Sequence, residues 1–242
     1  SGYTFSGWSG AISSASNPVC VVGSSSNQQI TASYTENSQA TSVTVASASA
    51  TYGDSSVTLS ATVSPNPGGG SVSFSVDGSP AGSGAVGAGG VATVSFNPGS
   101  LNAGSYTIQA SFGGSGTFLA SNGSGTLSIG QAASTTTVSC PAGPFTYTGS
   151  AQTPCSASVT GAGSLNQPLS VSYSNNTNAG TATASASYAG DVNHSGSSDT
   201  ENFTIEQASS TTTVTCGAGP FTYNGLAQEP CSASYTTSDG LS

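Results

Sequence analysis

Four of the five cysteines lie in two similar stretches, and they are the residues of this chain whose spacing most clearly predicts chemistry. The stretch CPAGPFTYTGSAQTPC spans residues 140–155, and CGAGPFTYNGLAQEPC spans residues 216–231. Each cysteine pair bounds a loop of 16 residues at the same place in a copied unit, so we predict disulfides Cys140–Cys155 and Cys216–Cys231. The long gap between the cysteines differs from the short spacing of zinc knuckles. Two disulfides indicate an oxidising, extracellular setting.

The fifth cysteine, Cys20, has no partner once the other four cysteines are paired in this way. Two interpretations stay open for it: a half-cystine whose partner lies outside the chain, or a buried free thiol. A nucleophilic role is disfavoured because no histidine or obvious base lies near it in the sequence.

The single histidine, His194, lies in the stretch GDVNHSGSSD and is the only residue that could serve a Ser-His-acid site, with Ser195 beside it. The Gly and Asn residues around it favour a turn, so we predict an exposed turn histidine without a catalytic role. Four carboxylates nearby, Asp191, Asp199, Glu201 and Glu206, could in principle act as a glycosidase pair or bind calcium through oxygen ligands. Strand alternation and solubility explain them more simply, and we expect neither catalysis nor a required cofactor.

Composition and charge exclude several classes of partner. The chain has 242 residues, no lysine or arginine and a formal net charge of −9. Without cations it cannot neutralise phosphates, which disfavours nucleic acid and anionic membrane surfaces as partners. No apolar run approaches the length of a membrane span, so direct membrane insertion is not expected. Alternation of Val, Thr, Ile, Phe or Tyr with Ser, Thr or Gly predicts an all-β fold of small sandwiches.

An internal repeat organises the second half of the chain. Residues 131–166 and 207–242 share 24 identities in 36 positions, which sets a period of 76 residues. The complete copy continues through LSVSYS, GTATASASYAG and ENFTIE, each bounded by turn residues, whereas the second copy covers only the first half of the pattern. We therefore expect four parts: residues 1–36, 37–130, 131–206 and 207–242.

The four parts resemble modules of large bacterial surface proteins. Residues 131–206, from STTTVSC to ENFTIE, are similar to the MBG-type β-sandwich module, and 207–242 to the first half of a second one. The segment 37–130, with TYGDSSVTLSATVSP, GSVSFSVDG and AGSYTIQASFGG, resembles a bacterial Ig-like domain. Residues 1–36, with GYTFSGWSG, resemble the C-terminal half of an internalin-type B repeat. That resemblance implies that Tyr3, Phe5 and Trp8 are core residues.

The resemblance implies a non-catalytic stalk in a secreted or cell-surface, adhesin-like bacterial protein. The joints TENSQAT, IGQAAST and IEQASST are short, which favours a semi-rigid tandem array whose partners are neighbouring modules of the parent chain. A second hypothesis is a self-associating subunit of an extracellular filament or sheath made of copies of the chain, because lysine cannot protect its strand edges. A third, a carbohydrate-binding module, would need an exposed aromatic platform.

Overall fold

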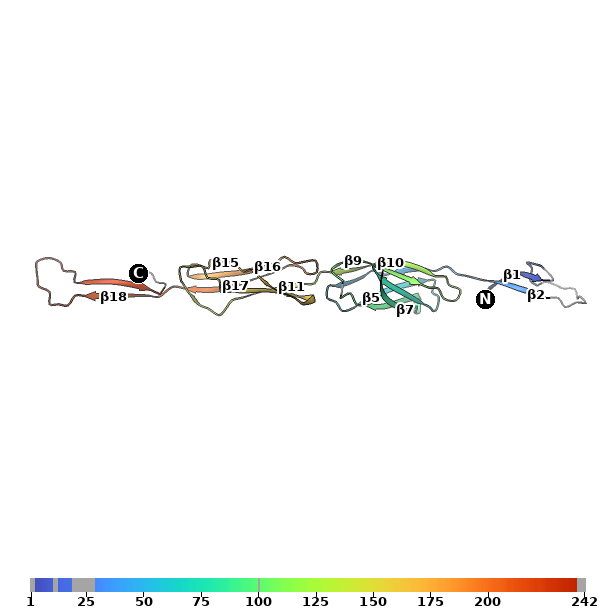
Figure 1. Ribbon diagram of the computed structural model, residues 1–242, viewed down its shortest axis with the longest axis horizontal. Helices are drawn as coiled ribbons and strands as arrows, with labels where there is room; N and C mark the ends of the chain where they lie inside the picture. Colours follow the sequence, from blue (N-terminus) through green and yellow to red (C-terminus); the bar gives the residue numbers. More distant parts are fainter. Residues whose placement is uncertain (1–2, 11–12, 19–28, 100, 239–242) are drawn as a thin grey trace, which may run out of the picture. The chain divides into compact units, whose positions relative to one another are not determined.

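The computed structural model describes residues 3–10, 13–18, 29–99 and 101–238, and it divides into two compact units, Ser1–Gly130 and Gln131–Ser242. Its elements are β-strands apart from two short 3-10 turns, which confirms the predicted all-β fold (Figure 1). No helix in this described part is long and apolar enough to cross a membrane. Cys20 lies outside the described residues.

The first unit begins with a two-stranded antiparallel sheet of β1 (Tyr3–Gly10) and β2 (Ile30–Glu36). The rings of Phe5 and Trp8 have centroids 5.4 Å apart, and the Phe5 and Tyr34 centroids are 5.7 Å apart. The indole Nε1 of Trp8 donates a hydrogen bond to the Ser16 carbonyl at 3.1 Å. These contacts form an aromatic cluster on one two-stranded sheet.

The expectation that Tyr3, Phe5 and Trp8 are core residues is wrong for the described structure. Tyr3 is exposed, and Phe5 and Trp8 are only half-buried. The physical reason is that β1 and β2 have no second sheet packed over them among the described residues. A single two-stranded sheet cannot enclose an aromatic side chain on all sides.

The rest of the first unit is a sandwich of two sheets. One sheet has the order β3-β5-β8 and the other β4-β10-β9-β6-β7. The strands are β3 (Ser42–Val45), β4 (Ala48–Thr51), β5 (Val57–Ser64), β6 (Ser71–Val76), β7 (Ser79–Ala85), β8 (Val91–Phe96), β9 (Gly104–Phe112) and β10 (Ser121–Gly130), with the turn η1 (Ala88–Gly90) before β8. All neighbours are antiparallel except β4 and β10, which run parallel.

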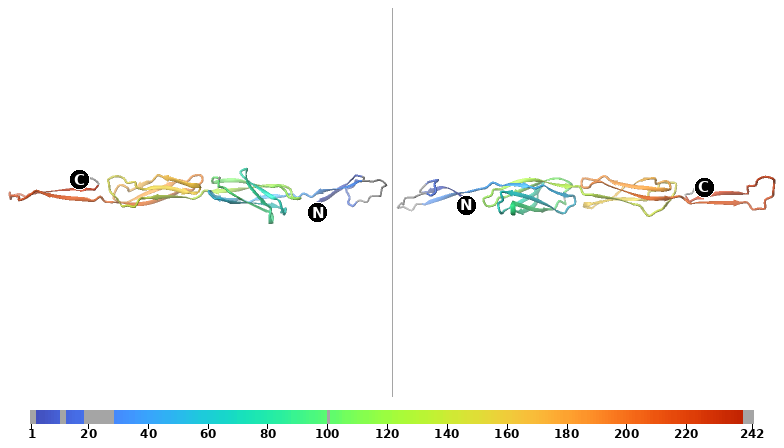
Figure 2. Two further views of the ribbon diagram at one scale, coloured as in Figure 1. Left: turned by 60° about the horizontal axis from the view of Figure 1, so that its bottom comes forward. Right: turned by 180° about the vertical axis from the view of Figure 1, so that it is seen from behind.

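The core of this sandwich follows from strict alternation along the strands. Every second residue is buried from Leu59 to Val63 in β5 and from Ile108 to Phe112 in β9, so both strands point one apolar row inward. The rows meet in one cluster that includes Leu59, Val72, Ile108, Phe112 and Leu127. Figure 2 shows the strands of this sandwich in cyan to green. At the start of β9 the hydroxyl of Tyr106 donates to the Asn102 carbonyl at 2.8 Å, a tyrosine corner of the kind found in Ig-type sandwiches.

Two glycines of β10 allow the sheets to approach closely at β3. A Cβ at Gly123 would overlap the backbone carbonyl of Val43, and a Cβ at Gly125 would lie 2.9 Å from Cγ1 of Val45. No side chain larger than hydrogen fits at Gly123 without moving a backbone segment. The tight spacing is therefore encoded by the NGSG stretch of β10.

The second unit contains a smaller sandwich. Its sheets have the orders β11-β13-β14 and β12-β17-β16-β15. The strands are β11 (Ser134–Ser139), β12 (Phe145–Thr146), β13 (Ser156–Gly161), β14 (Leu165–Leu169), β15 (Ser172–Ser174), β16 (Gly180–Tyr188) and β17 (Ser197–Glu206), with the turn η2 (Ala162–Ser164) before β14. As in the first sandwich, the opening segment contributes to both sheets, here through β11 and β12.

Small side chains form much of this second core. Ala182, Ala184 and Ala186 of β16 face inward, and Phe203 and Ile205 of β17 fill the space beside them. The Phe203 ring meets the ring of Phe145 edge to face, with centroids 5.7 Å apart.

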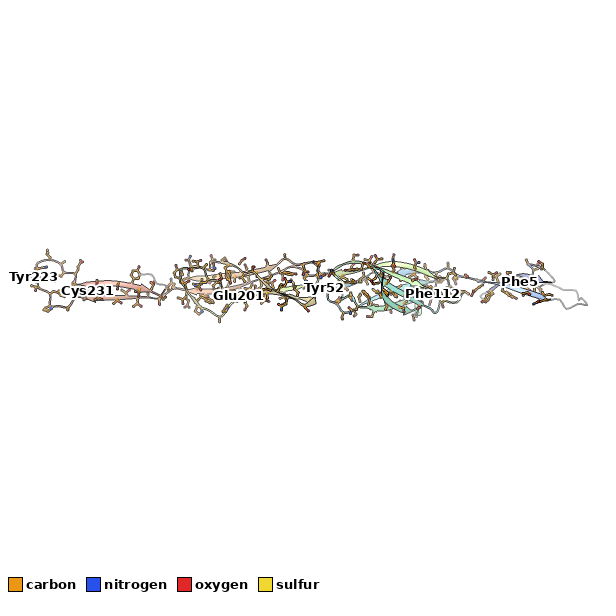
Figure 3. All side chains as sticks on the ribbon, in the orientation of Figure 1. Phe5, Tyr52, Phe112, Glu201, Tyr223 and Cys231 are labelled. Atoms are coloured by element: carbon orange, nitrogen blue, oxygen red, sulfur yellow. A yellow bond between two sulfur atoms is a disulfide. The ribbon has the colours of Figure 1, made fainter. Side chains whose placement is uncertain are left out.

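The last described segment is a single hairpin of β18 (Ser210–Cys216) and β19 (Cys231–Thr237). Nearly all of its residues are exposed. Figure 3 shows Tyr223 at the tip of the loop that joins the two strands, with Cys231 where the loop returns to the hairpin.

The close approach of the sheets at Gly123 predicts a stability defect. We expect Gly123→Ala to lower the free energy of unfolding of the 43–130 sandwich by about 1–3 kcal/mol, because the added methyl must displace the Val43 backbone. Hydrogen exchange of the β9 amides across a urea series measures the change. Gly113→Ala is the matched control, since a Cβ there has no neighbouring atom within 4 Å. Equal stability of the two variants would contradict the close-approach argument.

Candidate functional site

A cluster of hydrogen-bonded polar side chains lies in the loop between β16 and β17. Asp191 is its centre. One carboxylate oxygen, Oδ1, accepts hydrogen bonds from the backbone N–H groups of Asn193 and His194, both at 2.7 Å. The other oxygen, Oδ2, accepts a hydrogen bond from the Tyr188 hydroxyl at 2.8 Å. The loop is thus closed around one carboxylate.

These hydrogen bonds shift the acidity of the groups involved. The Tyr188 hydrogen bond, with smaller contributions from Asn193 and His194, lowers the pKa of Asp191 from 3.8 to about 2, against an opposing effect of desolvation. Desolvation and the neighbouring Asp191 carboxylate raise the pKa of Tyr188. Asp191 therefore stays ionised and Tyr188 stays protonated at neutral pH.

His194 is held between this carboxylate and a distant turn. Its Nδ1 lies 2.9 Å and 3.1 Å from the two oxygens of Asp191, and its Nε2 lies 2.9 Å from the carbonyl oxygen of Ala162 in η2. Both ring nitrogens therefore face acceptor oxygens. The imidazolium form makes both hydrogen bonds, whereas a neutral ring has only one N–H to donate.

The prediction of an exposed turn histidine is wrong in its exposure and correct in its turn. His194 lies in the loop after β16 but is only 5% exposed. The reason is a set of long-range contacts that the local sequence does not reveal: the Ala162 carbonyl, and backbone hydrogen bonds of 2.9 Å that join Asn193 and Ser195 to Ala132. The loop is therefore fastened both to η2 and to the segment that precedes β11.

The geometry of this cluster favours a structural role over catalysis, because its side chains hold the loop in place by hydrogen bonds. An Asp-His pair could orient an imidazole for proton transfer, but the Nε2 that would face a nucleophile is directed at the Ala162 carbonyl. The hydroxyl of Ser195 lies 3.3 Å from the Ala132 carbonyl and donates to it. These side chains hold backbone groups together.

Asp199 has a similar structural role between the two sheets. Its Oδ2 accepts a hydrogen bond from the backbone N–H of Val138 at 2.8 Å, which links β17 of one sheet to β11 of the other. Hydrogen bonds from the Val138 and Thr200 backbone lower the pKa of Asp199. Beside it, the Ser197 hydroxyl lies 2.7 Å from both Ser134 Oγ and Thr136 Oγ1.

The four calcium candidates are not gathered into one ligand group. Asp191 lies in the loop, Asp199 and Glu201 lie on β17, and Glu206 lies at its end on the opposite face from Asp199. Across the described ranges, no three His, Cys, Asp or Glu side chains come together in a metal-ligating arrangement.

Both pairs of copied cysteines are joined by disulfides, Cys140 to Cys155 and Cys216 to Cys231. Each bond lies across the end of an antiparallel pair, since Ser139 is opposite Ser156 and Cys216 is opposite Cys231. In the complete copy this is the point where the chain leaves β11 and crosses to β12. The bond therefore holds the strand pair closed where its ladder ends.

Tyr173 secures the same point from the second half of the module. Its hydroxyl donates to the Cys155 carbonyl and accepts from the Cys155 N–H, both at 2.9 Å. Sequence analysis did not single out Tyr173 or Tyr188. For Tyr188 the sequence does contain a signal of its role in this cluster, since Tyr188, Asp191 and His194 are spaced three residues apart in YAGDVNH.

A groove of the first sandwich lies over strands β6, β9 and β10. It has a volume of about 690 Å³, and its lining includes Ser73, Ser75, Gln109, Ser111, Asn122 and Ser124. The one aromatic side chain at the groove, Phe74, is buried in the core. The groove therefore lacks the exposed aromatic platform that a carbohydrate-binding module would use.

Comparison with known proteins supports the assignment of the first sandwich. Residues 43–130 match the family model of the bacterial Ig-like domain (group 3), which confirms the Ig-like resemblance of this part. The resemblances of 1–36 to an internalin-type repeat and of 131–242 to MBG-type modules remain predictions. None of the curated proteins has a sequence that matches the chain.

Several solved structures are distantly similar to the chain, and two of them illustrate how distant the similarity is. Escherichia coli alpha-2-macroglobulin activated by porcine elastase has 9% identity and a TM-score of 0.32 over 78% of this chain, and the match spans only 25% of that protein. Titin domains z1z2 in complex with telethonin have 17% identity and a TM-score of 0.37, over 70% of this chain and 98% of that one. Likenesses this distant do not bear on function.

Removal of the His194 ring should destabilise the second sandwich. We expect His194→Ala to lower its free energy of unfolding by about 1–3 kcal/mol, because the carboxylate of Asp191 and the carbonyl of Ala162 lose a shared buried partner. Urea unfolding followed by hydrogen exchange of the β17 amides measures this. Val192→Ala, at an exposed position of the same loop, should be neutral. If His194→Ala leaves the free energy of unfolding unchanged, the hydrogen bonds of His194 contribute nothing to the stability of this sandwich.

Acid should weaken the same sandwich through Asp191 and Asp199. Their folded-state pKa values lie below those of unfolded aspartate, so their contribution is complete above pH 4 and is lost as the pH falls towards 2. The expected result is faster exchange of the β11 and β17 amides as the pH falls from 4 to 2, after correction for intrinsic exchange. Asp191→Asn should reduce this pH dependence, and an unchanged profile would contradict the assignment.

Proposed function

We propose that this chain is a non-catalytic structural segment of a large secreted or cell-surface repeat protein, an adhesin-like stalk. Its Ig-like sandwich belongs to a type of module that occurs in tandem arrays, and its two disulfides fit an oxidising, extracellular compartment. The role of such a segment is to space and display, and binding would reside in other domains of the parent protein.

The joint between the two units is the observation that carries this proposal. Gly130 is the last residue of β10, and its carbonyl accepts a hydrogen bond from the Tyr52 N–H at 2.9 Å within the first unit. The next residue, Gln131, donates from Nε2 to the Asp191 carbonyl at 2.6 Å within the second unit. The connection between the two units is therefore short in the sequence, and it contains no Gly/Ser run of the kind that makes a linker flexible. We infer a semi-rigid tandem array from this short connection.

The use of the reactive side chains also supports a structural role. In the second unit Asp191, His194 and Asp199 hold backbone groups, and four cysteines are consumed in disulfides. An enzyme needs some of its titratable groups free to meet a substrate. Within the described residues the side chains of Asp191, His194, Ser195 and Asp199, which sequence analysis considered for catalysis, make hydrogen bonds within the fold.

The alternative of a filament built by edge pairing receives less support from the sandwiches. Although lysine is absent, some of their edge strands carry other protection: Pro80 and a bulge at β7, and Pro168 in β14. The edge strands β4, β12 and β15 have only two to four residues each. Proline, bulges and shortness are known means of blocking edge-to-edge association.

A scattering experiment tests the stalk. The chain and a variant with a flexible Gly-Ser segment inserted between Gly130 and Gln131 are compared by small-angle X-ray scattering. We expect the natural chain to be extended with a narrow distribution of sizes, and the insertion to broaden that distribution, because it removes the restraint at the joint. Equal distributions for the two proteins would show that the joint is already flexible, and the stalk proposal would fail.

A further inference from the structure

In the first sandwich the opening segment runs beside the last strand, in the same direction. The contact starts with a parallel bridge between Gln39 and Phe118, and the Thr41 hydroxyl donates to the Leu119 carbonyl at 2.8 Å. Further along, β3 closely approaches the two glycines of β10, and the contact ends in the parallel pairing of β4 with β10. We call this contact the parallel seam of the sandwich; it comprises residues 39–51 and 118–130.

The second sandwich has a parallel seam of the same kind, made by other groups. It starts with a parallel bridge at Ala132 and ends in the parallel pairing of β12 with β17. Between these points side chains of β17 bond to β11 of the other sheet. The Ser197 hydroxyl lies 2.7 Å from Oγ1 of Thr136, and Asp199 accepts from the Val138 N–H at 2.8 Å. This seam comprises residues 131–146 and 191–206.

Tension along the chain loads both seams in shear. A module that precedes a sandwich pulls on its opening segment, and a module that follows it pulls on its last strand. Because these two segments run in the same direction, tension pulls them in opposite directions along their length, and the bonds between them share the load. An antiparallel pair pulled apart at one end would instead open one bond at a time. Each seam therefore lies between the two points where force enters the sandwich.

The backbone part of the seam is shorter in the second sandwich. β4 pairs with β10 at four residues, whereas β12 pairs with β17 at only two. The disulfide Cys140–Cys155 also encloses β12, so tension that reaches Cys140 is carried by the disulfide to β13. The hydrogen bonds of Ser197 and Asp199 then join the loaded strand β11 to β17.

We propose that the parallel seams are load-bearing elements, and that Ser197 and Asp199 supply the resistance to tension in the second sandwich. This inference rests on the proposed stalk, because a stalk is held at both ends and is therefore placed under tension. It goes beyond the stalk because it names the side chains on which the resistance depends. Close packing at glycines and a four-residue ladder have this role in one sandwich, and hydroxyls and a carboxylate have it in the other.

The test holds the full oxidised chain by its two ends and measures the rate at which each sandwich unfolds at constant force. Forced unfolding is governed by the unfolding rate rather than by equilibrium stability. A Cys140→Ser, Cys155→Ser variant identifies the two events. It releases the 14 residues between these cysteines, so the extension gained when the second sandwich unfolds grows by up to about 50 Å. The extension gained from the first sandwich stays the same.

We expect Ser197→Ala and Asp199→Ala each to raise the forced unfolding rate of the second sandwich about tenfold, because each removes hydrogen bonds that the load must break. The rate of the first sandwich should not change. Thr200→Ala, at the exposed neighbouring position of β17, is the matched control and should leave both rates unchanged.

A second control separates resistance to force from stability. Ala184→Gly removes a buried methyl group from β16, which lies outside the seam. It should lower the stability of the second sandwich in urea, as Asp199→Ala does, but leave the forced unfolding rate nearly unchanged. Ser197→Ala keeps the test decisive if Asp199→Ala does not fold.

Two results would overturn the proposal. One is an equal rise in forced unfolding rate for Ala184→Gly and Asp199→Ala at equal loss of stability in urea, which would spread the resistance over the whole fold. The other is a natural forced unfolding rate for both Ser197→Ala and Asp199→Ala, which would place the load elsewhere. A failure of the stalk proposal is distinguishable, because a flexible joint in the scattering experiment leaves the unfolding rates of the single sandwiches as they are.

Discussion

The two-layer sandwich is the constraint on which the rest of this structure depends, because a sheet with one apolar face is stable in water only when a second layer covers that face. Both sandwiches satisfy this requirement for a second layer in the same way. The opening segment pairs with one sheet through β3 or β11 and then crosses to the other through β4 or β12. One continuous stretch of chain therefore ties the two layers together. The hairpins β1–β2 and β18–β19 show the opposite case, since neither has a covering layer among the described residues and their aromatic side chains remain partly or fully exposed.

The absence of lysine and arginine shapes how polar groups are satisfied. In other proteins a carboxylate commonly pairs with a cationic side chain, but here the exposed Asp191 and the partly buried Asp199 accept hydrogen bonds from backbone N–H groups. Backbone donors cost no side-chain ordering and no desolvation of a second charge, so they can stabilise a carboxylate without an ion pair. His194, the only histidine in the sequence, lies against the carboxylate of Asp191. No described buried side-chain nitrogen or oxygen lacks a hydrogen-bond partner.

The features that sequence analysis predicted correctly are those determined locally. Alternation of apolar and polar residues in VTLSATVS and SYTIQASF is visible in the sequence, and both segments are strands with one buried row. The burial of His194 was missed because it depends on Ala162, which is 32 residues away and is brought near by the pairing of β13 with β14. The hydrogen bonds between Asp199 and Val138 and between Tyr173 and Cys155 join different sheets or different halves of the module. No local sequence pattern predicts them. Core positions for Tyr3 and Trp8 were inferred from a resemblance, and such positions require a second layer that the described hairpin does not have.

The repeat separates these local and long-range contributions within one chain. The hairpin, its register, the disulfide and the hydrogen bond from Gln228 to Thr222 occur in the half module, so they need only residues 207–238. Three features occur only in the copy that includes residues 165–206. They are the strand at Phe145, the burial of Val138 and the hydrogen bond from the Tyr173 hydroxyl to the Cys155 carbonyl. A disulfide across the hairpin restricts the chain before the second layer arrives, which lowers the entropy lost when that layer packs. Local pairing and the disulfide thus account for the hairpin, whereas burial of its apolar side chains requires a second layer.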